Sequence, residues 1–193
     1  MSRPAVFLDR DGVLVEEVFY PQTGEWEAPL FPEDVKLTDG AAAAVRAFRR
    51  AGYVTVLISN QGGYAKGKTS LRALWQAHER FVALLAAQDV SLDAVFYSYS
   101  HPEGVVEHFA GESLDRKPSP YNVLIAAARL DLDISRSWLV GDRLTDAACA
   151  KAAGLRALLV NNPHSPITAP AEVMVETITD AVRHICGEIG CAS

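Results

Sequence analysis

The chain has 193 residues, of which 49% are apolar and 22% charged, and its formal net charge is −6. This size and composition predict a single globular domain over residues 1–193, and the acidic balance argues against nucleic acid as a partner. The cysteines lack metal-ligand spacing, and the chain has neither a signal-peptide pattern nor an apolar run that could cross a bilayer. We therefore expect a soluble, cytoplasmic protein.

The first apolar run, at residues 5–8, leads directly into Asp9 and Asp11, and Gly12 follows. Carboxylates on alternate positions of an extended segment point the same way, so both could meet one substrate. Such a pair repels itself unless a cation or a shared proton offsets the charge. Aspartate and glycine are also common turn residues, so this stretch alone leaves an acidic turn open as well.

The next segment, residues 16–34, is rich in proline and aromatic residues and predicts a long ordered loop over the end of the first strand. Beyond it, strand-like runs alternate with helical patterns, which predicts an α/β fold: a Rossmann-like parallel sheet covered by helices on both faces. The expected elements are a helix at 39–51 capped by Thr38 or Asp39, a strand at 53–58, a helix at 70–88, a strand at 92–99, a helix with Ser119 as its cap and Pro120 at its first position, a strand at 137–140, a helix at 145–154, and strands at 156–160 and 173–175 before a helix begun by Thr177.

Polar residues follow several of these strands, where open α/β sheets bind their ligands. They are Asp9 and Asp11, Ser59 and Asn60, Lys117 at a helix entrance, and Asp142 with Asp146. Each could be an ordinary turn residue. Together they supply the carboxylates, donors and cation that phosphoryl transfer needs, and Mg²⁺ is the ion that suits such carboxylates.

Four motifs in order make the sequence recognisable: DRDG at 9–12, SNQ at 59–61, RKP at 116–118 and VGDRLTD at 140–146. They resemble the haloacid dehalogenase (HAD) superfamily of phosphatases. With HPEG at 101–104, the chain looks like the D-glycero-D-manno-heptose 1,7-bisphosphate phosphatases, and histidinol-phosphate phosphatases belong to the same branch.

The resemblance implies a role for most motif residues. Asp9 would be the nucleophile. Asp11 would protonate the leaving oxygen and then activate water, while its backbone carbonyl contacts the metal. Asp142 would be a further Mg²⁺ ligand, with Asp146 as an outer support, and Lys117 would hold the phosphate and orient Asp9. The phosphate- and substrate-binding residues implied by the resemblance are Arg10, Gly12, Ser59, Asn60, Gln61 and Arg116.

The intervals between the motifs are filled by the expected elements, so the resemblance implies a HAD fold without a cap domain, in which the loops at 16–34 and 98–115 select the substrate. The family typically has a zinc site before RKP, but the matching positions here are Ser98, Ser100, Ser113 and Asp115. Serine is a poor zinc ligand, so we expect no structural zinc. Glu25 and Glu27 would repel an anionic substrate if they faced the pocket.

The sequence thus predicts a Mg²⁺-dependent phosphatase of a small phosphorylated sugar, a heptose bisphosphate first, acting as a monomer without nucleic-acid or membrane partners. Histidinol phosphate or another phosphomonoester is the alternative substrate. A non-catalytic HAD-like binding domain is the alternative of a different class.

Overall fold

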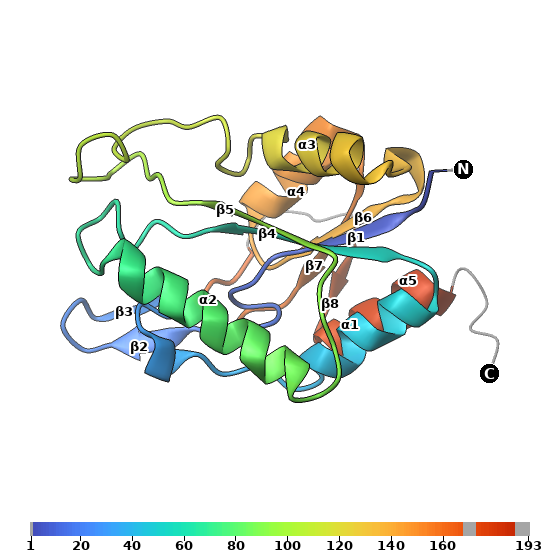
Figure 1. Ribbon diagram of the computed structural model, residues 1–193, viewed down its shortest axis with the longest axis horizontal. Coiled ribbons are helices and arrows are strands. Elements are labelled where there is room, and N and C mark those ends of the chain that lie inside the picture. The colour runs from blue at the N-terminus through green and yellow to red at the C-terminus, as the bar shows by residue number, and fades with distance from the viewer. Residues whose placement is uncertain (1, 168–172, 188–193) are drawn as a thin grey trace.

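The computed structural model describes residues 2–167 and 173–187, and within them the chain forms a six-stranded sheet with strand order β5-β4-β1-β6-β7-β8. Every pairing in this sheet is parallel. β1 lies inside the sheet, between β4 and β6 (Figure 1). The chain first adds β4 and β5 on one side of β1, and then crosses over to add β6, β7 and β8 on the other side. The predicted parallel α/β sheet is confirmed.

The main elements match the predicted alternation. In chain order they are β1 (Ala5–Leu8), β2 (Val18–Tyr20), β3 (Glu25–Glu27), a 3₁₀ turn (Pro32–Asp34), α1 (Ala41–Arg50), β4 (Val54–Asn60), α2 (Leu71–Ala86), β5 (Ala94–Ser98), α3 (Tyr121–Leu130), a second 3₁₀ turn (Ile134–Arg136), β6 (Trp138–Gly141), α4 (Leu144–Ala153), β7 (Arg156–Val160), β8 (Met174–Val175) and α5 (Ile178–Gly187). In the described residues, no further domain is inserted between them.

Helices cover both faces of the sheet (Figure 1). One face packs on α1, α2 and α5 through a core that includes Val45, Phe81 and Ile185. The other packs on α3 and α4 through Val123 and Cys149, among others. Since both faces are covered, β1 is fully buried, and its polar neighbours reach solvent only at the carboxyl edge of the sheet.

The segment at 16–34 differs from the expected loop, because it contains the antiparallel hairpin of β2 and β3. Two of its aromatic residues, Phe19 and Trp26, lie opposite each other on the two short strands. Two hydrogen bonds at the Tyr20 hydroxyl anchor its base: the hydroxyl donates to Asp34 Oδ2 at 2.6 Å and accepts from the Leu30 N–H at 2.8 Å.

Two helix caps also differ from the prediction. Gly40, with a φ of +81°, precedes α1 in place of a Thr38 or Asp39 cap, and the Thr38 hydroxyl donates to the Val13 carbonyl instead. Pro120 is the N-cap of α3 rather than its first residue, although the Ser119 hydroxyl still accepts from the Tyr121 N–H at 3.3 Å. Neither change moves a helix by more than about a turn, as is usual for helix boundaries.

Among the described helices, none combines the length and the apolar character that crossing a membrane requires.

Candidate active site

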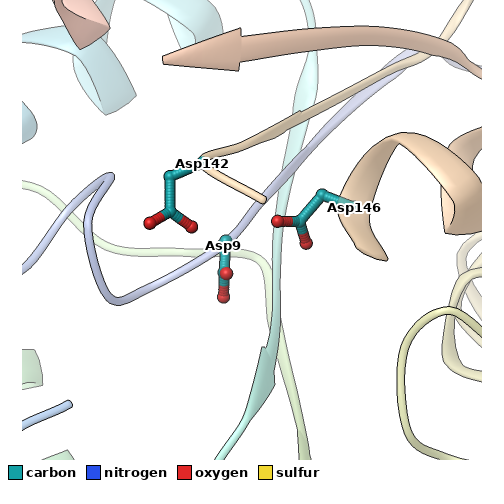
Figure 2. Close-up of side chains that lie close together, drawn as sticks. All are labelled: Asp9, Asp142 and Asp146. Carbon is teal, nitrogen blue, oxygen red and sulfur yellow. The ribbon is translucent and has the colours of Figure 1, made fainter. Parts of the chain in front are cut away.

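Three buried carboxylates meet at the carboxyl edge of the sheet. Asp9 follows β1, Asp142 follows β6, and Asp146 lies in the first turn of α4, so three separate elements deliver them to one place (Figure 2). One oxygen of each lies within 4.8 Å of the others. Gly141 makes the approach of α4 possible, because a Cβ at that position would lie 2.3 Å from the Asp146 Cβ.

The charge of Asp142 is poorly compensated within the protein. Burial, then the neighbouring Asp9 and Asp146, raises the pKa of Asp142 to about 8. One oxygen of Asp142 accepts from the Asn162 amide at 2.6 Å, whereas the other, Oδ1, is buried and has no hydrogen-bond partner in the described part of the chain. An all-oxygen donor set with an unsatisfied carboxylate oxygen suits a hard divalent cation. The residues therefore fit Mg²⁺.

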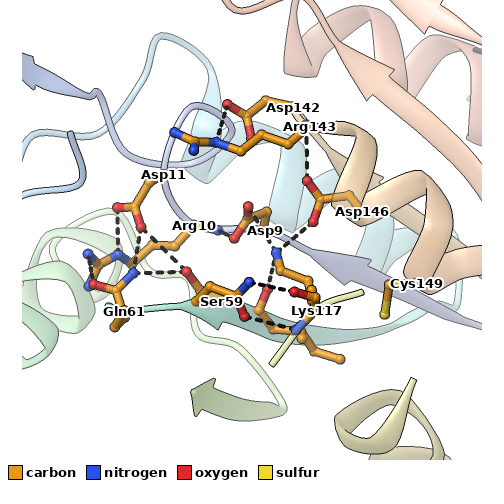
Figure 3. Close-up of polar contacts among 12 residues, drawn as sticks. Asp9, Arg10, Asp11, Ser59, Gln61, Lys117, Asp142, Arg143, Asp146 and Cys149 are labelled. Carbon is orange, nitrogen blue, oxygen red and sulfur yellow. Dashed lines mark hydrogen bonds and ion pairs between the residues drawn. The ribbon is translucent and has the colours of Figure 1, made fainter. Parts of the chain in front are cut away.

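Lys117 is the cation that the protein itself supplies. Its ammonium lies 2.9 Å from Asp9 Oδ2 and 2.6 Å from Asp146 Oδ1, and it donates to the Ile58 carbonyl at 3.0 Å (Figure 3). Burial disfavours its charge, but the attraction of Asp146 and Asp9 outweighs that cost and raises the pKa of Lys117. Both oxygens of Asp146 are in use, since the second accepts from the Arg143 N–H at 3.0 Å.

Asn60 lies at the end of β4, where it was predicted, but its side chain reaches Lys117. The amide nitrogen donates to the Lys117 carbonyl at 3.1 Å, and the amide oxygen accepts from the Lys117 N–H at 3.0 Å. This two-point contact fixes the backbone that carries the ammonium. Asn60 also lies on the wall of the cavity that opens over the site, so its predicted contact with a phosphate stays a prediction.

Asp11 lies in a separate group of hydrogen bonds on the other side of Asp9 (Figure 3). Its Oδ1 accepts from Arg10 Nε at 2.8 Å, and its Oδ2 accepts from Gln61 Nε2 at 2.5 Å and from the Ser59 hydroxyl at 3.4 Å. Arg10 also donates to Gln61 Oε1 at 2.7 Å, so Arg10, Asp11 and Gln61 form a closed ring of hydrogen bonds. The side chains of Arg10 and Gln61 are buried and orient Asp11, and their predicted role in binding substrate stays a prediction.

A cavity of about 470 Å³ opens over these residues. The predicted site residues that line its walls are Asp9, Asp11, Ser59, Asn60, Arg116 and Lys117. The volume is in the range of small-molecule sites.

The hairpin forms one wall of this cavity through Glu25, Trp26 and Glu27. Neither glutamate presents a free charge, because Lys68 Nζ lies 3.0 Å from Glu25 Oε2 and 2.7 Å from Glu27 Oε1. The repulsion expected from two unpaired glutamates is therefore reduced.

Sequence reasoning missed a second row of residues behind Asp142. Asn162 donates to Asp142 and also to Glu17 at 3.0 Å, and Arg143 donates to the other oxygen of Glu17 at 2.6 Å. Gly12 packs against this row, since a Cβ there would lie 2.3 Å from Asp142 Oδ2 and its φ is +76°. Asn162 could have been found, because it follows β7 as the other site residues follow their strands; nothing in the sequence singles out Glu17.

The loop before Lys117 is held by hydrogen bonds at the positions that depart from the family pattern. Asp115 Oδ1 accepts from the Ser98 hydroxyl at 2.9 Å and from the Ser113 hydroxyl at 2.5 Å. The Arg116 guanidinium donates to the Ser100 carbonyl at 2.8 Å. This cluster ties the end of β5 to the segment that carries Arg116 and Lys117.

Comparison with known proteins identifies the family. A family model described as HAD-hydrolase-like matches residues 114–181. A D-glycero-D-manno-heptose-1,7-bisphosphate 7-phosphatase of Thermosynechococcus vestitus is 44% identical over 164 residues, or 83% of this chain and 80% of the relative. The chain belongs to the heptose-1,7-bisphosphate phosphatase family of HAD hydrolases.

Other members of the heptose-1,7-bisphosphate phosphatase family match almost end to end. The D-glycero-beta-D-manno-heptose-1,7-bisphosphate 7-phosphatase of Vibrio cholerae is 32% identical over 192 residues, covering 96% of this chain and 95% of the relative. The solved structure of a D,D-heptose 1,7-bisphosphate phosphatase from B. bronchiseptica, complexed with magnesium and phosphate, has a TM-score of 0.76 and 25% identity, covering 96% of this chain and 99% of that one. The chain is a HAD-family phosphatase, a phosphomonoesterase.

Proposed function

We propose that this chain is a Mg²⁺-dependent phosphatase that removes the 7-phosphate of D-glycero-D-manno-heptose 1,7-bisphosphate, with residues 1–193 acting as one catalytic domain. The observation that carries the proposal is the meeting of Asp9, Lys117 and Asp142 beside a cavity of about 470 Å³ in a member of this family. Relatives that share 32–44% of the sequence are named for this substrate, which supports extending it to this chain.

Asp9 is the nucleophile in this proposal. Lys117 holds one of its oxygens at 2.9 Å and the Arg10 N–H donates to the other at 2.7 Å, so the carboxylate has a fixed orientation. An Asp9 oxygen bonds to phosphorus as the bond from phosphorus to the sugar oxygen breaks, giving an aspartyl phosphate. Ser59 holds phosphate oxygens, and Lys117 offsets their charge.

Asp11 carries the proton. It donates a proton to the departing sugar oxygen, and afterwards accepts one from the water that attacks phosphorus and releases Asp9. The Arg10 and Gln61 contacts orient its carboxylate, and Arg116, on the cavity wall, contacts the substrate away from the reacting phosphate.

Mg²⁺ would be held by Asp9, Asp142 and the backbone carbonyl of Asp11, and it would neutralise charge on the phosphate oxygens. Asp146 lies close enough to contribute an oxygen, but its contacts with Lys117 and Arg143 make it a support for Lys117.

The test is phosphate release with and without Mg²⁺ across a substrate panel. The panel holds both anomers of the heptose 1,7-bisphosphate, histidinol phosphate, common sugar phosphates and a 3′-phosphorylated oligonucleotide. We expect a strong, Mg²⁺-dependent preference for the heptose bisphosphate, with loss of the 7-phosphate. A preference for histidinol phosphate would replace the substrate, and hydrolysis of none of the panel would favour a binding domain.

Two variants test the mechanism. Asp9→Asn should abolish turnover while circular dichroism shows the fold retained. Asp89→Asn makes the same chemical change on the exposed surface, in the turn after α2, and should keep wild-type activity. Full activity of Asp9→Asn would overturn the assigned nucleophile.

A further inference from the structure

Arg10 is a buried cation that contacts Asp11. Its side chain is among the largest that the described core encloses completely. Within the described residues, the ion pair that Arg10 forms is with Asp11, from Nε to Oδ1 at 2.8 Å. A buried charge is costly unless it is paired, so the position of the guanidinium determines where the Asp11 carboxylate lies.

A tyrosine from another strand supports the guanidinium. Tyr97 belongs to β5, and Arg10 Cζ lies over its ring, 5.7 Å from the centroid. A guanidinium over an aromatic face is attracted to it, and more strongly where water is excluded. Burial raises the pKa of Tyr97 to about 12, although Arg10 opposes the rise. The hydroxyl therefore keeps its proton and can donate it in a hydrogen bond.

His78, on α2, is the partner of that hydroxyl. Its Nδ1 lies 3.1 Å from the Tyr97 oxygen, and the two rings meet edge to face with their centroids 5.5 Å apart. Burial, then the charge of Arg10, lowers the pKa of His78, so the ring is uncharged at neutral pH and Nδ1 can accept the hydrogen bond. His78, Tyr97 and Arg10 thus form a row of contacts that ends at Asp11.

This row fixes the direction in which Arg10 points. Two nitrogens of the guanidinium donate to Asp11 and Gln61, and its charge lies over Tyr97 (Figure 3). Loss of the support at Tyr97 would let the guanidinium turn and take the Asp11 carboxylate with it. A proton donor must lie within hydrogen-bond reach of the oxygen that it protonates, so even a small turn slows the transfer. Neither His78 nor Tyr97 lines the catalytic cavity, so both would act through Arg10.

We propose that Tyr97 and His78 are positioning residues for the reaction: they hold Arg10 and, through it, the Asp11 carboxylate that moves the proton. The inference rests on the proposed function, because it takes Asp11 as the proton donor to the leaving oxygen. Tyr97 and His78 should therefore matter most for a leaving group that needs a proton. A sugar alkoxide needs one, whereas 4-nitrophenolate leaves as the anion.

The experiment compares the heptose 1,7-bisphosphate with 4-nitrophenyl phosphate. In Tyr97→Phe, which removes only the hydroxyl, we expect kcat/KM for the sugar phosphate to fall about tenfold and kcat/KM for 4-nitrophenyl phosphate to stay within about twofold. The values of kcat should fall for both substrates, because Asp11 also activates the water that releases Asp9. 4-Nitrophenol should then appear in a burst that matches the number of active sites.

His78→Leu and His78→Asn form a matched pair. Leucine removes the hydrogen-bond acceptor and should reproduce the pattern of Tyr97→Phe, whereas asparagine offers an amide oxygen near the position of Nδ1 and should restore most of the wild-type kcat/KM. Tyr121→Phe is the control, because it removes a hydroxyl from an exposed tyrosine that does not line the catalytic cavity, and it should leave both substrates unchanged. Thermal unfolding of each variant checks that the domain stays folded.

Three results would overturn the proposal: equal losses of kcat/KM for both substrates in Tyr97→Phe, no loss for the sugar phosphate in that variant, or His78→Asn behaving like His78→Leu. Asp11→Asn tests the proposed function separately. If it fails to separate the two substrates, Asp11 is not the proton donor and the inference falls with that assignment. If it separates them and Tyr97→Phe does not, the inference alone fails. Should the wild type not hydrolyse the heptose bisphosphate, the sugar or alcohol phosphate of the panel that it prefers takes its place.

Discussion

Replacing Lys117 with methionine should destabilise the protein strongly as well as inactivate it. Methionine keeps the length of the side chain but removes the ammonium that lies between Asp9 and Asp146. The side chain is almost fully buried, so water cannot replace the lost charge. Asp9 and Asp146 would then face each other and Asp142 without the ammonium between them, and only Asp142 would keep a cation nearby, Arg143 Nε at 3.8 Å, among the described residues.

The magnitude follows from the two contacts. At about 3 Å and an effective dielectric constant of about 20, each pair is worth roughly 5 kcal/mol of Coulomb energy. Much of that is offset by the cost of burying the ions, and removal of one partner from a buried pair typically costs about 3–5 kcal/mol. We expect a loss of about 3–5 kcal/mol in the free energy of unfolding when Mg²⁺ is chelated.

The loss should also depend on pH. Burial raises the pKa of Asp146, and Lys117 opposes that rise, so its removal raises this pKa further. A carboxyl group whose folded pKa exceeds its unfolded value keeps a proton that the unfolded chain has released, and stability then falls as pH rises between the two values. The deficit of Lys117→Met should be larger near about pH 8 than near about pH 5.

Urea unfolding in the presence of a chelator measures both effects. Lys66→Met is the matched control: Lys66 lines the same cavity, but forms no ion pair within the described residues, so its free energy of unfolding should stay within about 0.5 kcal/mol of wild type. A loss below about 1 kcal/mol for Lys117→Met near about pH 8 would refute the reasoning that its charge compensates the carboxylates.

Three further outcomes are expected. Gly141→Ala should lower the free energy of unfolding by about 1–3 kcal/mol, because the new Cβ would lie 2.3 Å from the Asp146 Cβ. An unchanged midpoint of urea unfolding would contradict that contact. Mg²⁺ should raise the melting temperature of the wild type and of Asp89→Asn but not of Asp142→Asn, and an equal rise in all three would remove Asp142 from the metal site. Burial, then Lys66 and Arg116, lowers the pKa of His101 to about 4, so the unfolded chain binds more protons below about pH 6.5 and stability falls on acidification. His101→Gln should reduce this loss of stability at acid pH by less than about 1 kcal/mol, since the ring is partly solvated. A larger loss of stability at acid pH in the variant would contradict the lowered pKa.

Hydrophobic periodicity was enough to predict the sheet and its helices, because the buried runs at β1 and β4 and the apolar stripe of α2 are determined by local sequence. The hairpin at 18–27 was not predictable in the same way. Its strands have three residues each, and what fixes them are contacts with distant groups, such as those of Lys68 with Glu25 and Glu27. Short strands with long-range anchors leave no periodic signal.

The same distinction applies to the site. Asp9 and Asp142 directly follow β1 and β6, Ser59 lies at the end of β4, and Lys117 lies in the loop between β5 and α3. The order of a parallel sheet brings such positions together at its carboxyl edge. What each side chain contacts was not predictable. The contacts of the Asn60 amide with the Lys117 backbone, for example, depend on the path of a segment whose course the sequence does not reveal.

The position of β1 has a consequence for how the protein is made. β1 is synthesised before both of its neighbours in the sheet, of which β6 begins only at Trp138, and Asn162 comes later still. Until those residues are synthesised, one edge of β1 lacks a partner and Asp9 lies beside no Asp142. The nascent chain therefore carries a hydrophobic strand with one unpaired edge until β6 is made. Long-range pairing of this kind slows folding and favours aggregation. Truncation before β6 should yield an insoluble fragment rather than a weakened enzyme.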